Sequence, residues 1–159
     1  MADREVSVER EIAAPADEVW QALTDLESMP LVLGGVDSVE VLTPGPFGVG
    51  TRWRETRRMF GKSATEEMWV TACEAPSRYV TEAENAGMRY ESEFRLAGRG
   101  PGRTAVRMTF AARPLEGRKL PLLARLLGGV GARAVAKAIE KDLADVAASL
   151  ERTRRDGGA

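Results

Sequence analysis

Residues 135–150 read VAKAIEKDLADVAASL, a pattern that predicts a long amphipathic helix. Its large apolar residues recur at steps of three and four, the period of an amphipathic α-helix: Val135, Ile139, Leu143, Val146 and Leu150. Residues 122–130 predict a shorter helical piece before it, and glycines at 128, 129 and 131 predict a break between the two. Residues 152–159 are charged and end in glycines, so we expect a disordered tail there.

The sequence ahead of this helix alternates between apolar and polar residues, which predicts strands with one buried face. Pro15 and two acids introduce a predicted helix at 16–24, and a short helical turn and loop follow at 26–35. This order segregates helices from an antiparallel sheet, so the fold class is α+β, in a single domain spanning 1–159. One face of the sheet should be exposed to solvent, and the other should pack on the long helix. Seven strands are predicted, at 4–12, 36–42, 51–60, 63–74, 78–84, 88–96 and 104–112.

Composition excludes several classes of function. The 23 basic and 24 acidic side chains nearly cancel, so nucleic acid is not an expected partner. No apolar run reaches the roughly 20 residues that span a bilayer, and no signal peptide is evident, so we expect a cytoplasmic protein without membrane insertion. The chain has no histidine and one cysteine, which removes histidine-dependent nucleophiles and the usual zinc ligand sets. No metal or cofactor is expected, and both a monomer and a homodimer stay open.

Four stretches together resemble one superfamily. They are IAAPADEVWQALTDLE at 12–27 with Pro30 shortly after, GVGTRW at 48–53, CEAPSR at 73–78, and residues 143–151. The chain resembles the SRPBCC superfamily, which includes START-like, polyketide cyclase/dehydrase and pollen-allergen-type helix-grip proteins. The resemblance implies a curved seven-stranded sheet wrapped around the last helix, with two short helices between the first two strands. It also implies an elongated cavity for a lipid, polyketide, steroid or other apolar compound.

The strand at 51–60 carries charge on both faces, which is unusual for a core strand. Trp53, Glu55 and Arg57 share one face, and arginines occupy most of the other. If Trp53 points inward, Glu55 and Arg57 accompany it, and buried charges are costly unless they pair or serve a ligand. We hypothesise that Arg57 holds a ligand carbonyl or carboxylate while Glu55 orients it or accepts a proton. An edge or exposed strand with solvated arginines is an equally open alternative.

The last two predicted strands would form one wall of the cavity. The wall residues are Tyr90, Ser92, Phe94, Met108 and Phe110, and a packed core is the alternative for each of them. The Tyr90 and Ser92 hydroxyls need hydrogen bonds on an apolar wall, which a ligand can supply, and Tyr90 is a second candidate for proton transfer. The other candidates are Trp69, whose face depends on a bulge, and Leu123 and Leu127, which could be core, cavity roof or a partner surface.

Three functions are compatible with these residues. The first is binding of a hydrophobic small molecule, which needs no catalytic group. The second is a polyketide cyclase/dehydrase-like enzyme, in which Glu55 or Tyr90 moves a proton without histidine or metal. The third is a co-chaperone-type protein-interaction module, for which the sequence offers no specific residue.

Overall fold

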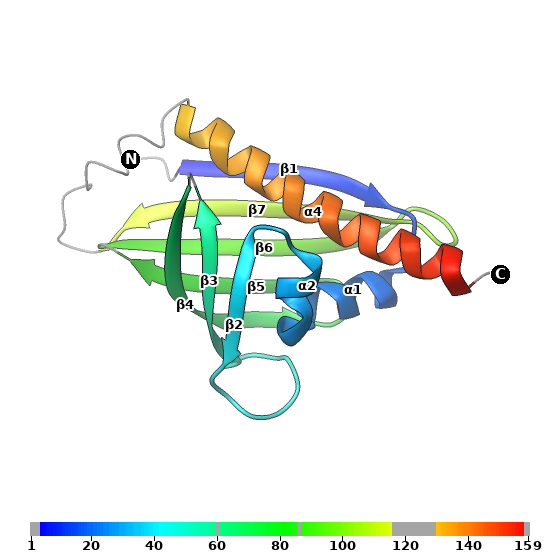
Figure 1. The fold of residues 1–159 in the computed structure, drawn as a ribbon, viewed down its shortest axis with the longest axis horizontal. Helices are drawn as coiled ribbons and strands as arrows, with labels where there is room; N and C mark the ends of the chain where they lie inside the picture. Colours follow the sequence, from blue (N-terminus) through cyan, green and yellow to red (C-terminus); the bar gives the residue numbers. More distant parts are fainter. Residues whose placement is uncertain (1–3, 60, 86, 116–129, 158–159) are drawn as a thin grey trace.

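Seven strands within the described part of the chain form one antiparallel sheet. The computed structural model describes residues 4–59, 61–85, 87–115 and 130–157. The strands are β1 (Arg4–Ile12), β2 (Val36–Val41), β3 (Arg52–Met59), β4 (Lys62–Glu74), β5 (Arg78–Asn85), β6 (Met88–Gly98) and β7 (Thr104–Pro114). Their order in the sheet is β1-β7-β6-β5-β4-β3-β2, so the first strand closes against the last (Figure 1). Each predicted strand is confirmed, with ends that differ by two residues or fewer.

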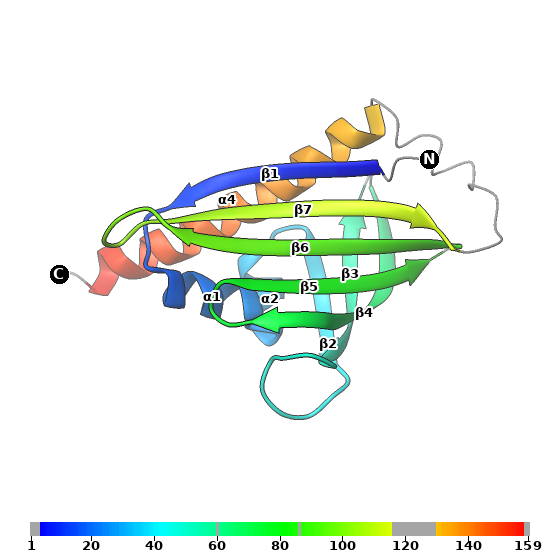
Figure 2. The same cartoon turned by 180° about the vertical axis from the view of Figure 1, so that it is seen from behind.

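The helices lie together on one side of the sheet. Helix α1 (Ala16–Thr24) has the predicted bounds, and it is followed by the 3₁₀ turn η1 (Leu26–Ser28) and the one-turn helix α2 (Met29–Val32). Helix α4 (Val130–Gly157) crosses the same face diagonally (Figure 1). Figure 2 shows the opposite, outer face of the sheet with the strands in front of α4. The α+β class and the helix-grip arrangement are therefore confirmed.

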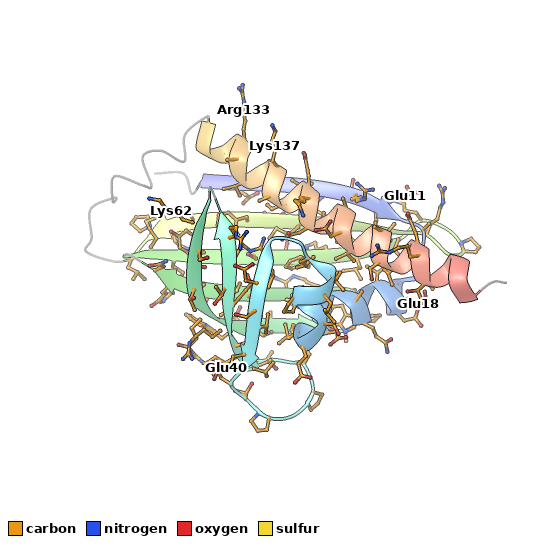
Figure 3. All side chains as sticks on the ribbon, in the orientation of Figure 1. Glu11, Glu18, Glu40, Lys62, Arg133 and Lys137 are labelled. Atoms are coloured by element: carbon orange, nitrogen blue, oxygen red, sulfur yellow. The ribbon has the colours of Figure 1, made fainter. Side chains whose placement is uncertain are left out.

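The apolar stripe of α4 packs on the inner face of the sheet. Ile139, Leu143 and Val146 are buried in one cluster with β-strand residues such as Val106 and Leu96. On the opposite side of α4, Arg133 and Lys137 are exposed and point away from the sheet (Figure 3). The helix thus buries the stripe that its three-and-four spacing predicts.

The C-terminal helix is longer than predicted. It continues to Gly157, so residues 152–157 are helical where a disordered tail was expected. The shorter helical piece predicted at 122–130 falls almost wholly on residues 116–129, which lie outside the described residues.

A bulge in β4 lets the sheet curl around the helices. The register of β4 against β5 shifts between Val70 and Ala72, and bulges bend a strand and increase its twist. In Figure 1, β2 and β3 run across the direction of β6 and β7, which brings them round toward α2 and α4. The curl brings Arg57 of β3 within reach of Asp142, near the middle of α4.

Candidate functional site

The face of β3 that carries Trp53, Glu55 and Arg57 is the inner face. In the β3–β4 register these residues are opposite Met68, Glu66 and Ala64. Trp53 is 2% exposed and packs with Leu26 and Val70, whereas Arg54 on the other face is exposed. Because β3 is paired on both sides, by β2 and β4, it is not an edge strand. The edge-strand alternative is therefore wrong, while Arg54 and Arg58 on the outer face are exposed, as that alternative expected.

Glu55 and Arg57 form an ion-paired cluster with a third residue, Asp142 of α4. Arg57 Nε lies 3.3 Å from Glu55 Oε2, and Arg57 Nη1 and Nη2 lie 3.2 Å and 2.9 Å from Asp142 Oδ1 and Oδ2. The side chains of Glu55, Arg57 and Asp142 are 12%, 22% and 25% exposed. The cluster thus links the inner face of the sheet to α4 through a bidentate contact between Arg57 and Asp142.

The protonation of Glu55 is shifted by its surroundings. Burial raises the pKa of the Glu55 carboxyl above its ordinary value of 4.5, because the charged form loses hydration. Arg57 opposes the rise in the pKa of Glu55, while the negative charges of Asp142 and Glu66 add to it. Protonation of Glu55 would leave Arg57 and Asp142 as a pair of zero net charge.

A glycine pair lets the chain pass close to this cluster. The Gly34 N–H donates to Asp145 Oδ2 at 3.0 Å, which ties the segment after α2 to α4. A Cβ built at Gly35 would lie 3.3 Å from Arg57 Nη1, tighter than ordinary packing. A side chain at position 35 would press on the guanidinium, so Gly35 leaves room for the cluster.

The predicted wall of β6 and β7 also lies on the inner face. The register places Tyr90, Ser92 and Phe94 opposite Ala112, Phe110 and Met108. Tyr90 stacks on Phe110 with ring centroids 5.7 Å apart. Ser92 is buried, while Tyr90, Phe94, Met108 and Phe110 are only half-buried despite facing inward. Burial raises the pKa of the Tyr90 hydroxyl, so it stays protonated near neutral pH.

One predicted site residue, Trp69, lies on the wrong face. The β4 bulge turns Met68, Val70 and Cys73 inward, opposite Ala83, Thr81 and Tyr79. Trp69 pairs with Glu82 and Arg52 on the outer face, and the Arg52 guanidinium carbon lies 4.7 Å from the centroid of its ring. Its assignment to the ligand site was therefore wrong. Leu123 and Leu127 lie outside the described residues.

Three inner-face residues were not predicted. Asp142 follows Ile139 by three and precedes Val146 by four, so its place in the apolar stripe of the helix was a signal in the sequence. Tyr79 is buried, stacks on Phe94 at 4.6 Å, and donates to the Leu23 carbonyl at 3.4 Å. Burial raises the pKa of Tyr79, and the charge of Glu55 raises it further. Thr81, next along the inner face of β5, is 2% exposed.

Aromatic side chains fill the inner face near α1. Phe47, from the glycine-rich loop before β3, packs edge-on against Trp20 and Tyr79 at 6.4 Å and 5.1 Å. It also lies 6.4 Å from the Trp53 ring. The loop therefore contributes a half-buried aromatic residue that packs against the core.

Two kinds of feature are absent from the described residues. Within these ranges, no group of three His, Cys, Asp or Glu side chains is placed to hold a metal ion. Likewise, none of the described helices is long and apolar enough to cross a membrane.

A family model described as polyketide cyclase/dehydrase and lipid transport matches residues 3–151. The chain belongs to this family. The resemblance to the SRPBCC superfamily that the sequence motifs carried is confirmed. A search of curated proteins finds no match for this member of the polyketide cyclase/dehydrase and lipid transport family.

Solved structures similar to this family member share its fold. The Zhui aromatase/cyclase from Streptomyces sp. R1128 is 21% identical, with a TM-score of 0.81 and coverage of 99% of each chain. TTHA0849 from Thermus thermophilus is 23% identical, with a TM-score of 0.77 over 94% of this chain and 99% of its own. A START superfamily protein from Mycobacterium smegmatis is 19% identical, with a TM-score of 0.65 over 87% of this chain and 95% of its own.

Proposed function

We propose that this chain binds an apolar small molecule, a polyketide, lipid or similar compound, between the inner face of its sheet and α4. The observation that carries the proposal is the Glu55–Arg57–Asp142 cluster on a largely apolar inner face. Burying ionised groups is costly, and replacing such groups by apolar ones is often neutral or stabilising. A ligand that uses the cluster gives these residues a role that packing alone does not.

The free hydrogen-bonding capacity of the cluster indicates the kind of ligand group. Arginine carries five N–H donors, and the contacts to Glu55 and Asp142 use three, so 5 − 3 leaves two toward other partners. Two carboxylates already surround Arg57, and a third would be repelled. A neutral carbonyl or hydroxyl oxygen fits the remaining donors better than a carboxylate does.

Half-buried apolar side chains supply the second part of the site. Phe94, Met108 and Phe110 face inward yet keep partial exposure. Apolar surface of this kind stabilises a bound apolar compound by about 25 cal/mol for each Å² removed from water. The ligand would therefore place its apolar body along β6 and β7 and its oxygen toward β3.

The proposal predicts that Arg57→Ala weakens binding of an oxygen-bearing probe. The probe is 2-naphthol, compared with 2-methylnaphthalene, which has the same shape without the hydroxyl. Hydrogen bonds to charged groups contribute about 1.5–3 kcal/mol, so we expect the naphthol affinity to fall about tenfold or more. Isothermal titration calorimetry measures both affinities, and the methylnaphthalene affinity should change little.

Arg54→Ala is the matched control, because Arg54 lies on the outer face of the same strand and pairs with exposed Glu40. It should leave both affinities unchanged. If Arg57→Ala and Glu55→Gln both leave the naphthol affinity unchanged, the assignment of the cluster is wrong. If neither probe binds the parent chain, the proposal of an apolar ligand is wrong.

An enzymatic function of the cyclase/dehydrase kind is the second candidate, and the raised pKa of Glu55 favours it. A carboxyl group that titrates closer to neutral pH is a better general acid or base. Arg57, at hydrogen-bond distance from Glu55, would polarise a substrate carbonyl. This candidate requires Glu55 to hold its proton above the ordinary carboxyl range, which the pH dependence of stability measures.

A further inference from the structure

Two buried polar atoms on the inner face have no hydrogen-bond partner within the described structure. They are Nε1 of Trp53 and Oγ1 of Thr81. Both residues are 2% exposed, so bulk water does not satisfy them. A buried polar group without a partner costs free energy, and most such groups in native proteins are paired.

The two residues flank the side chain of Val70 on the inner face. Thr81 is directly opposite Val70 in the β4–β5 register, and Trp53 packs with Val70 in one buried cluster. Ser92, also buried, is opposite Thr81 on the other side. Thr81 and Trp53 therefore lie on the same part of the inner face, next to the Glu55–Arg57–Asp142 cluster.

Resting on the proposed function, we infer that Trp53 and Thr81 bind a second neutral oxygen of the ligand, beyond the one that faces Arg57. The indole N–H only donates, whereas the threonine hydroxyl donates and accepts. A carbonyl oxygen can accept from either group, and a ligand hydroxyl can in addition donate to Thr81. No formal charge lies on either residue, so this part of the site selects an uncharged oxygen.

Another buried threonine, Thr104, has a hydroxyl group that makes a hydrogen bond within the fold. Thr104 on β7 is 0% exposed, and its hydroxyl donates to the Ala14 carbonyl at 2.8 Å. The contrast makes Thr104 a matched control for Thr81. Thr104→Val removes a hydrogen bond that holds the fold, whereas Thr81→Val removes a hydroxyl that bonds nothing in the described fold.

The test compares probes with one and two hydroxyl groups. The parent chain, Thr81→Val, Trp53→Phe and Thr104→Val are titrated with 2-naphthol and with 2,6- and 2,7-dihydroxynaphthalene. We expect at least one dihydroxy isomer to bind the parent about tenfold more tightly than 2-naphthol, the gain of roughly one good hydrogen bond. Thr81→Val and Trp53→Phe should each remove most of this gain, while Thr104→Val keeps it.

Thermal unfolding without a ligand gives an independent readout. Thr81→Val should keep or raise the Tm, and Thr104→Val should lower it by a few degrees. Equal affinities of the parent for one-hydroxyl and two-hydroxyl probes would overturn the inference, as would a gain that survives in both variants. A lowered Tm in Thr81→Val would also overturn it. If 2-naphthol itself does not bind, the proposed function fails first, whatever the second hydroxyl does.

Discussion

Glu55 is the residue at which burial and charge pairing oppose each other. Burial raises the pKa of its carboxyl, the neighbouring Arg57 lowers it, and the net direction is upward. The folded chain therefore holds this proton more tightly than the unfolded chain does. Between 4.5 and the raised value, the folded state carries more protons, so this residue's contribution to stability falls as pH rises.

Glu55→Gln should remove that fall in stability. The variant keeps the other charged groups that face this position, Arg57, Asp142 and Glu66, and it also keeps Tyr79. Urea unfolding from about pH 4 to about pH 7 measures the difference between the parent and the variant. The variant should gain stability relative to the parent as pH rises.

The control is Glu67→Gln, because Glu67 is exposed on the outer face, 3.5 Å from Arg52. It should reproduce the parent's loss of stability through this pH window. A Glu55→Gln curve parallel to that of the parent would show that Glu55 holds no extra proton. The cyclase/dehydrase candidate would then lose Glu55 as its acid or base.

The sequence predicted which residues of β3 share a face, but it did not predict that Asp142 pairs with one of them. Alternation alone placed Trp53, Glu55 and Arg57 on one face, because the strand period is two. It could not show that Asp142, some 85 residues later, meets Arg57, since that contact depends on how the sheet curls. Trp69 was misplaced because a bulge changes which residues face inward, and a bulge leaves no fixed period in the sequence.

At the scale of elements, α4 is held mainly by its apolar stripe. Leu143 is 2% exposed and lies in the cluster that joins α4 to the sheet and α1. Leu143→Ala should lower the free energy of unfolding by about 2–5 kcal/mol, the loss typical of a buried leucine. Urea denaturation measures it.

Lys137→Ala is the control, because Lys137 points to solvent from the same helix (Figure 3). Its effect should stay within about 0.5 kcal/mol. If Leu143→Ala lowers the free energy of unfolding no more than Lys137→Ala does, α4 is not held by packing against the sheet.

The elements were the most predictable level of this structure. Strand alternation, the helix stripe and the Pro–Gly breaks are local signals, so the bounds of α1 and the seven strands followed from them. The end of α4 was less predictable. Charged residues near a terminus are compatible both with a frayed tail and with a solvated helix, and here the helix continues to Gly157.

At the scale of the whole molecule, fold and family follow from motifs, whereas the ligand depends on contacts between distant elements. The motifs at 12–27 and 48–53 are turns and packing positions, so they indicate the helix-grip fold and not the ligand or reaction. The polar groups of the site come from β3, β5 and α4, which meet only in three dimensions. The preference for a neutral oxygen that we propose for these groups could therefore not be predicted from the sequence.

The most direct test of the central claim follows the methionine methyl groups by NMR. Met68, Met88 and Met108 lie on inner-face positions of β4, β6 and β7. With methyl-¹³C-methionine in the full chain and a titration of 2-naphthol, their signals should shift together, saturate with one affinity and show contacts to the naphthol ring. If these methyl signals stay in place while 2-naphthol is saturating, the ligand does not occupy the space between the sheet and α4, and the account is wrong.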